Sequence, residues 1–314
     1  MKTIYLNREG ERAVPCVATI GFFDGVHLGH RYIINEVMTI AQGDGQASMV
    51  VTFERHPRQV LHSEWCPQLL STLDEKVALL SETGIDYLVV LQFDESMAAL
   101  SARDFMHDIL QQRLGVRTLV TGYDNRFGHN RTEGFDDYVR YGREMGMTVV
   151  QGMPFDAEGI RVSSSKVRRL LSEGQVEQAS QCLGRPYVLA GQVVRGDHIG
   201  TGMGFPTANL HLEDESKLVP ASGVYAVKVR ISESAEVYRG MMNIGSRPTF
   251  GGHRQTLETH IFNFSGDIYD QQLTVWFVSR LRSEMKFDSR EALMLQLRTD
   301  LHQAEAALDI NSGL

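Results

Sequence analysis

The stretch TIGFFDGVHLGHRYII, residues 19–34, decides the fold of the first half of the chain. It begins in an apolar run, CVATI, that is typical of a buried strand, and it leads into apolar residues repeated at helical spacing between Arg31 and Ala41. A loop between a strand and a helix is where an open α/β sheet places its ligand crevice. Because Gly21 and Gly25 let the backbone approach a ligand, we expect a phosphate site here.

The same alternation of strands and helices continues to Met153. Helix starts are expected at Ser71 with Asp74 and at Ser101 with Asp104. This rhythm predicts a parallel sheet with right-handed crossovers. The expected strands are CVATI, ASMVVTF, YLVVLQF, RTLVTGY and MTVVQGM.

A helical stretch, SSSKVRRLLSEGQVEQASQCLG, then ends at Gly184, and after it the strands follow one another without helices. Short strands of this kind predict a closed or nearly closed antiparallel barrel, on which a last helix, Ser289 to Leu308, packs. We therefore expect two unlike domains, 1–184 and 185–314. The expected barrel strands are YVLAGQVV, GVYAVKVRI, VYRGMMNI, LETHIFNF and QQLTVWFVSRL.

Composition narrows the class of protein. The 314 residues carry a net charge of -8, which opposes the clustered positive charge that nucleic acids require. No stretch approaches the roughly 20 apolar residues of a membrane span, and the first residues reach charged side chains before any apolar run. Three widely spaced cysteines predict unpaired thiols. We expect a soluble, cytoplasmic protein without nucleic-acid or membrane partners, and the oligomeric state stays open.

Two histidines in the first loop suit phosphate chemistry. His27 and His30 are three residues apart at a helix start, so both imidazoles can face one phosphate. Attack on the α-phosphorus of ATP builds negative charge that two histidines and a helix N-terminus can stabilise. The alternatives are a metal-binding pair or two surface histidines at a helix cap, but the glycine-containing loop favours phosphate over zinc.

These residues also resemble a known family. GFFDGVHLGH, residues 21–30, resembles the HxGH signature of the nucleotidyltransferase superfamily, in the form typical of bacterial FAD synthetases. Three further stretches of that family follow in order, with departures at Glu54, Arg55, Asn125 and Ser165. They are VTFERHP at 51–57, TGYDNRFGHNRTE at 121–133 and VSSSKVRRLL at 162–171. The resemblance implies a Rossmann-like nucleotidyltransferase domain that adenylylates FMN with ATP.

The same resemblance implies the nucleotide-binding residues of this domain. Taken alone, Ser163 to Ser165 read equally well as a helix cap and Arg168 as a solvated helix face. Without the resemblance, Asp124 and Arg126 are interpreted as a turn. The ATP-binding residues that the resemblance implies are Gly21, Phe23, Gly25, Asp124, Arg126, Ser164, Ser165 and Arg168.

The second half contains a glycine-rich loop, 196–204, that runs into GFPTANL. A plain β-turn explains the loop alone, but GFPTAN resembles the motif of riboflavin kinases. That resemblance implies ATP binding at Gly200 and Thr207, and Mg²⁺ held by Thr207 and Asn209, whose oxygens are ligands that suit this ion. The family commonly has a basic residue where this chain has Thr201, which leaves one phosphate contact open.

Glu258, in LETHIF, matches the catalytic carboxylate of riboflavin kinases. A carboxylate near ATP can orient the primary hydroxyl of riboflavin and accept its proton. On sequence alone Glu258 reads as an outward-facing strand residue, and Arg282, Glu284 and Lys286 as a solvated charge cluster.

Together the resemblances imply an enzyme that phosphorylates riboflavin to FMN and adenylylates FMN to FAD, with ATP and Mg²⁺ for both steps. The product of the barrel is the substrate of the α/β domain, so the two halves explain one another. Two alternatives stay open: an enzyme with one active domain, and a flavin-binding sensor without turnover. Residues that bind the flavin are not identifiable from the sequence.

Overall fold

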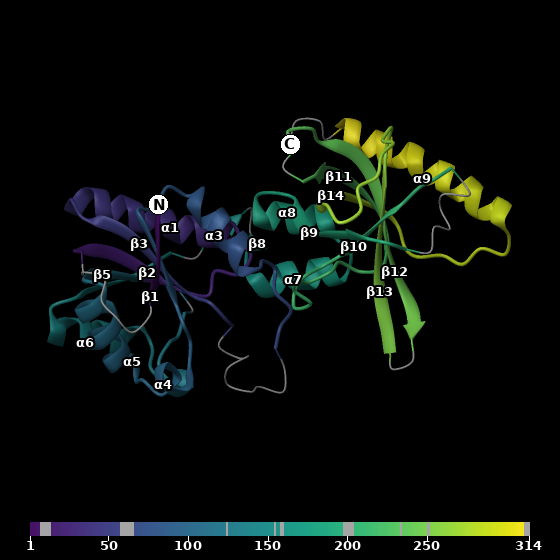
Figure 1. Cartoon of the computed structure of the whole chain (residues 1–314). Helices are drawn as coiled ribbons and strands as arrows, with labels where there is room; N and C mark the ends of the chain where they lie inside the picture. Colours follow the sequence, from purple (N-terminus) through teal and green to yellow (C-terminus); the bar gives the residue numbers. More distant parts are fainter. Residues whose placement is uncertain are drawn as a thin grey trace. The chain divides into compact units, whose positions relative to one another are not determined.

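The chain separates into two compact units in a computed structural model, Met1–Ser164 and Ser165–Leu314 (Figure 1). This division lies before the boundary predicted after Gly184. The predicted boundary concerns the domains as folding units, and it stays a prediction. The residues that the structure describes are 1–6, 14–56, 66–123, 125–153, 155–157, 160–196, 204–232, 234–249 and 252–310.

The first unit is built on a parallel six-stranded sheet, as predicted, in the order β1-β4-β3-β2-β5-β6. Its central strands are apolar and buried on both faces, which is typical of a parallel sheet covered by helices. The strands are β1 (Lys2–Leu6), β2 (Cys16–Ile20), β3 (Ala47–Phe53), β4 (Tyr87–Leu91), β5 (Val116–Thr121) and β6 (Thr148–Gln151), with a separate hairpin of β7 (Asp156–Ala157) and β8 (Ile160–Arg161).

The strand order reverses at β2, which pairs with β3 on one side and with β5 on the other. Ligands of open α/β sheets bind outside the carboxyl ends of the strands at such a switch point. The helical elements of this unit are α1 (Leu28–Asp44), α3 (Leu73–Ser81), α4 (Glu95–Ala98), α5 (Ala102–Asp104), the π-helix η1 (Phe105–Arg113), the 3-10 helix η2 (His129–Arg131) and α6 (Phe135–Met145).

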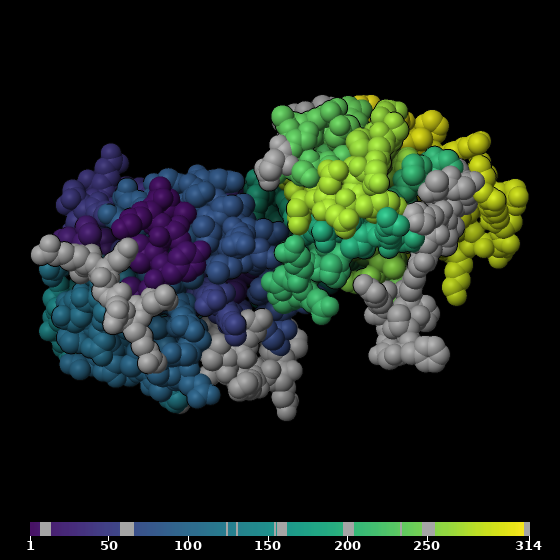
Figure 2. Space-filling model, viewed as in Figure 1, coloured from purple at the N-terminus to yellow at the C-terminus, as the bar shows by residue number. Residues whose placement is uncertain are grey.

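The edge strand β1 was not expected from the sequence. Among the described strands it pairs, in parallel, with β4 alone, and its side chains are partly exposed, with Tyr5 at 55%. Its purple atoms lie on the surface in Figure 2. Because an edge strand needs no continuous buried run, the periodicity that identified the other strands is weak here.

The helix starts lie close to their predicted positions. Helix α3 begins after Thr72, whose hydroxyl accepts from the Glu75 backbone N–H while the Glu75 carboxylate accepts from Thr72. This capping box lies one residue beyond the predicted pair. The predicted helical stretch before Gly184 is two helices, α7 (Ser164–Ser172) and α8 (Val176–Leu183), separated by a turn at Gly174, whose φ is 77°.

The second unit is a closed barrel in the order β10-β13-β12-β11-β14-β9, as predicted. The last helix, α9 (Arg290–Ile310), lies along the barrel and buries Ala304 and Leu308 against it (Figure 1). The short strand β10 was not expected. The strands are β9 (Tyr187–Val194), β10 (Ala208–His211), β11 (Gly223–Ile231), β12 (Tyr238–Thr249), β13 (Gly252–Ile261) and β14 (Gln272–Arg282).

Candidate active sites

The loop between β2 and α1 presents the two predicted histidines together. His27 caps α1, since its Nδ1 accepts from the backbone N–H of His30 at 3.2 Å. The two imidazole rings are stacked, with centroids 3.6 Å apart, and the ring of Phe23 meets His30 edge-on. Because Nδ1 of His27 is an acceptor, neutral His27 carries its proton on Nε2, which is the arrangement needed to donate to a phosphate oxygen.

Asp24 holds this loop from beneath. Its carboxylate is 2% exposed and accepts from the backbone N–H groups of Leu70 and Ser71, each at 3.0 Å. The Ser71 hydroxyl in turn accepts from the N–H of Gly25. Phe23, Gly25 and Val26 all have positive φ, which costs energy at the two non-glycine positions. These hydrogen bonds therefore hold a loop conformation that the chain would not adopt alone.

A buried lysine supports the same loop. Lys76, at the start of α3, is 2% exposed, and its ammonium donates to the backbone carbonyls of Phe22 and Phe53. The ammonium also lies 4.1 Å from the centroid of the Phe22 ring. Burial lowers the pKa of Lys76 to about 8, against the opposing effect of Asp24. The sequence contained no signal that separated this lysine from a surface residue of an amphipathic helix.

The loop after β5 meets the end of β2 at the switch point. Asn125, which departs from the family pattern, donates its carboxamide N–H to the carbonyl of Ile20 at 2.6 Å. Arg126 is exposed, and its carbonyl accepts from Arg131. Asp124 lies outside the described residues.

The predicted serine and arginine ligands are divided between the units. Ser164 donates its hydroxyl to the carbonyl of Asp24 at 3.1 Å, within the first unit. Ser165 is exposed and Arg168 is half-buried on α7 in the second unit, so their part in the nucleotide site remains a prediction.

The amide of Gly21 donates to the carbonyl of Val51 and continues the strand pairing into the loop.

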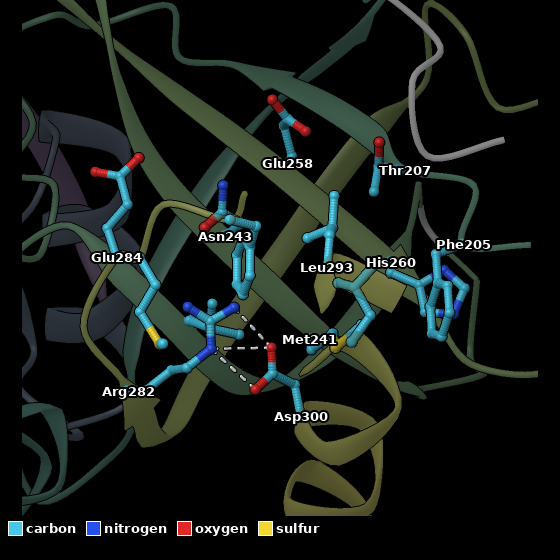
Figure 3. A pocket seen from close by; sticks show the side chains of 14 residues that line it. Phe205, Thr207, Met241, Asn243, Glu258, His260, Arg282, Glu284, Leu293 and Asp300 are labelled. Carbon is cyan, nitrogen blue, oxygen red and sulfur yellow. Dashed lines mark hydrogen bonds and ion pairs between the residues drawn. The ribbon is translucent and has the colours of Figure 1, made fainter. Parts of the chain in front are cut away.

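A cavity of about 270 Å³ lies between the barrel wall and α9 (Figure 3). Thr207 and Glu258, both predicted site residues, line it. Their oxygens lie toward one end of the cavity, and an ion pair of Arg282 with Asp300 lies toward the other. Most of the remaining lining is apolar, from Phe205, Val224, Met241, Met285, Phe287, Leu293 and Leu297.

Three polar residues form a row across neighbouring strands. Glu258 on β13 is register partner to Asn209 on β10 and to Asn243 on β12. Side chains directly opposite one another in an antiparallel ladder share a face of the sheet. The inner positions Leu257 and Thr259 alternate with Glu258 and are buried, so Glu258 faces outward into the cavity. The sequence interpretation of Glu258 as outward-facing was correct, and Asn243 was missed.

The oxygen donors at this end of the cavity fit a magnesium ion. The Thr207 hydroxyl lines the cavity with the Glu258 carboxylate, and Asn209 is the register partner of Glu258 on the neighbouring strand. A hydroxyl and a carboxamide oxygen are both hard ligands. Within the described ranges, no group of three or more His, Cys, Asp or Glu side chains could hold a metal. A Mg²⁺ ion usually keeps water and phosphate oxygens for most of its shell and takes few protein ligands. A Cβ on Gly196 would overlap the Asn209 carboxamide, which is therefore held against bare backbone. Gly200 and Thr201 lie outside the described residues.

The interpretation of Arg282 as a solvated charge was wrong. Its guanidinium donates to both oxygens of Asp300, which is fully buried, and Gln296 donates to the same carboxylate. Asp300 lies on α9, so this ion pair joins the last helix to the end of β14. Arg282 and Asp300 form no recognisable motif in the sequence, and the ion pair was missed for that reason.

Comparisons with known proteins agree with the two-unit architecture. A family model for FAD synthetase matches residues 10–166, and one for riboflavin kinase matches residues 183–308. A bifunctional riboflavin kinase/FMN adenylyltransferase of Escherichia coli strain K12 is 37% identical, over 91% of this chain and 90% of its own length. The protein of the same name from Pseudomonas fluorescens is 39% identical, over 93% and 92%.

A solved structure matches nearly the full length of the chain. It is a Streptococcus pneumoniae protein named as a macrolide-efflux protein, with a TM-score of 0.87, 30% identity, and coverage of 96% of this chain and 98% of that one. In the chain described here, no helix among the described residues has the length and apolar character to cross a membrane.

Proposed function

The chain belongs to the family of bifunctional riboflavin kinase/FMN adenylyltransferases, and we propose how its residues divide the two reactions. The enzyme phosphorylates riboflavin to FMN and adenylylates FMN to FAD, using ATP. The observation that supports the division most directly is that Thr207 and Glu258, far apart in the sequence, line one cavity of the barrel.

In the kinase reaction the primary hydroxyl of riboflavin attacks the γ-phosphorus of ATP, and ADP leaves. We assign Glu258 as the base that orients this hydroxyl and accepts its proton. Thr207 and Asn209 would hold Mg²⁺, which supplies charge neutralisation to the transferring phosphate. The apolar side of the cavity, beneath Leu293 and Leu297, suits the flat flavin ring, because it can bury aromatic surface while the ribityl chain reaches Glu258.

In the adenylyl transfer the phosphate of FMN attacks the α-phosphorus of ATP, and pyrophosphate leaves. No protein nucleophile is needed, so the work is charge stabilisation and positioning. His27 and His30 donate to the phosphate oxygens, supported by the N–H groups and dipole at the start of α1. Ser164, Ser165 and Arg168 are proposed to bind the remaining phosphates.

The other ATP contacts rest on the family resemblance. In the first unit they are Gly21, Phe23, Gly25, Asp124 and Arg126, and in the second unit Gly200 binds ATP with Thr207. We also propose that the folding domains divide after Gly184 and that the enzyme works in the cytoplasm, where its three free cysteines stay reduced.

One incubation tests both reactions. Pure protein with riboflavin, ATP and Mg²⁺ should yield FMN first and FAD later, resolved by chromatography. FMN alone would indicate one active unit, and unchanged riboflavin would indicate a binding protein. Repeating the incubation with EDTA tests the proposed metal: both products should fall, and turnover without a divalent ion would refute it.

A further inference from the structure

His260 joins two segments that the kinase reaction needs together. Its Nδ1 lies 2.8 Å from the backbone carbonyl of Pro206. Because a carbonyl only accepts, Nδ1 must carry the proton. His260 follows Glu258 by two residues on β13, and Pro206 directly precedes Thr207. The bond therefore links the strand of the proposed base to the turn of the proposed metal ligand.

The strand pairing explains why a side chain, and not the backbone, links β13 to the turn at Pro206. The ladder between β10 and β13 joins Asn209 to Glu258 and Ala208 to Thr259. The next pair in that register would be Thr207 and His260, but β10 begins at Ala208, and Pro206 has no N–H with which to continue a ladder. Beyond the last backbone pair, the imidazole holds the turn against β13.

Packing fixes the direction of this imidazole. Its ring meets Phe205 edge-on at a centroid distance of 5.2 Å and lies 5.7 Å from Phe262. Both phenylalanines belong to the buried cluster beneath α9. Burial lowers the pKa of His260, although the bond to Pro206 opposes this, so the neutral ring with its proton on Nδ1 is favoured near neutral pH.

We propose that His260 is a positioning residue of the kinase reaction, which sets the place of Thr207 relative to Glu258 by binding the Pro206 carbonyl. The proposal rests on the roles assigned above to Thr207 and Glu258. It assigns no chemical step to the imidazole.

Two matched substitutions test the bond without removing polarity. In His260→Asn the amide nitrogen can occupy the place of Nδ1, whereas in His260→Gln it falls nearer the place of Nε2. We expect His260→Asn to retain most of the kinase kcat and His260→Gln to lower it roughly tenfold, the effect of about one lost hydrogen bond on positioning. The Mg²⁺ concentration for half-maximal activity should rise in His260→Gln only.

Adenylylation of supplied FMN by the same samples controls for the amount of enzyme and should be unchanged in both variants, and the retained kinase activity of His260→Asn shows that the barrel tolerates a change at this position. Equal kinase activity in the two variants, or a parallel fall of both reactions, would overturn the proposal. The variant Thr207→Ala distinguishes a failure of the proposed role of Thr207 from a failure of the proposed role of His260. Full kinase activity in Thr207→Ala refutes the role of Thr207, whereas full activity in His260→Gln refutes the role of His260.

Discussion

Asn209 and Glu258 lie directly opposite each other on the neighbouring antiparallel strands β10 and β13. Their side chains therefore share one face of the barrel wall, where Glu258 lines the cavity under α9. This pairing brings a candidate metal ligand and a candidate base to one place.

Glu258→Gln should strongly slow the kinase reaction and leave the adenylylation of FMN unchanged. The amide keeps the size of the side chain but cannot accept the proton of the riboflavin hydroxyl, so kcat should fall by about a hundredfold or more. FAD formation from supplied FMN should be unchanged. Glu236→Gln is the matched control, because Glu236 is exposed and away from the cavity, and it should leave both reactions intact. Comparable kinase rates in the two variants would contradict the assignment of Glu258.

Substitutions of His27 should separate its two roles. The side-chain oxygen of asparagine can cap α1 as Nδ1 does, so His27→Asn should melt close to the wild-type temperature and still form no FAD. His27→Ala should lose FAD formation and also about 1 kcal/mol of stability, because the cap is lost. Both should form FMN at the normal rate. FAD formation by His27→Asn would show that the imidazole serves only as a cap.

Gly196→Ala should weaken the kinase reaction through Asn209. The added Cβ would overlap the Asn209 carboxamide, so this side chain must move away from its present place. We expect a higher Mg²⁺ requirement for FMN formation, measured by titration, with adenylylation unchanged. The control is Gly43→Ala in α1, where a Cβ meets nothing within 4 Å. That variant should be fully active and more stable by about 0.5 kcal/mol. An unchanged Mg²⁺ titration in Gly196→Ala would argue against Asn209 as a ligand.

Lys76→Met should change how stability depends on pH. The pKa of Lys76 is lowered by burial from 10.5 to about 8, so the unfolded chain binds more protons than the folded one between those values. Lys76 therefore makes the wild type relatively more stable as pH rises through about 8. Denaturant unfolding at about pH 7 and about pH 10 should show the wild type gaining on the order of 2 kcal/mol over Lys76→Met. A constant difference between the two proteins would mean that Lys76 titrates normally.

Local patterns identified most of the fold. Buried runs such as CVATI are strands because their side chains face apolar surroundings on both sides of a parallel sheet. Helix ends were predictable from capping residues and glycines, within one residue at α3 and at Gly184 for α8. The strands β1 and β10 were missed because an edge strand and a four-residue strand lack a distinct period.

The candidate sites were predictable only where one segment contains the chemistry. His27 and His30 come together because one helix start holds both, and their stacking follows from local geometry. Lys76 could not be recognised, since its burial depends on the carbonyls of Phe22 and Phe53 from other segments. Asp300 could not be recognised either, since its burial depends on the hydrogen bonds that Arg282 of β14 donates to its carboxylate.

By itself, the sequence predicted a phosphate-binding loop at His27 and His30 and showed a motif at Thr207 that resembles that of riboflavin kinases. These properties depend on backbone and side chains within a few residues. Only the tertiary structure decided that Glu258 lies between Asn209 and Asn243 and that His260 holds the turn before Thr207. Strand register and barrel closure bring these residues together. Hydrogen-bonded strand pairing joins residues that are far apart in the sequence, and no local sequence pattern shows which residues will be paired.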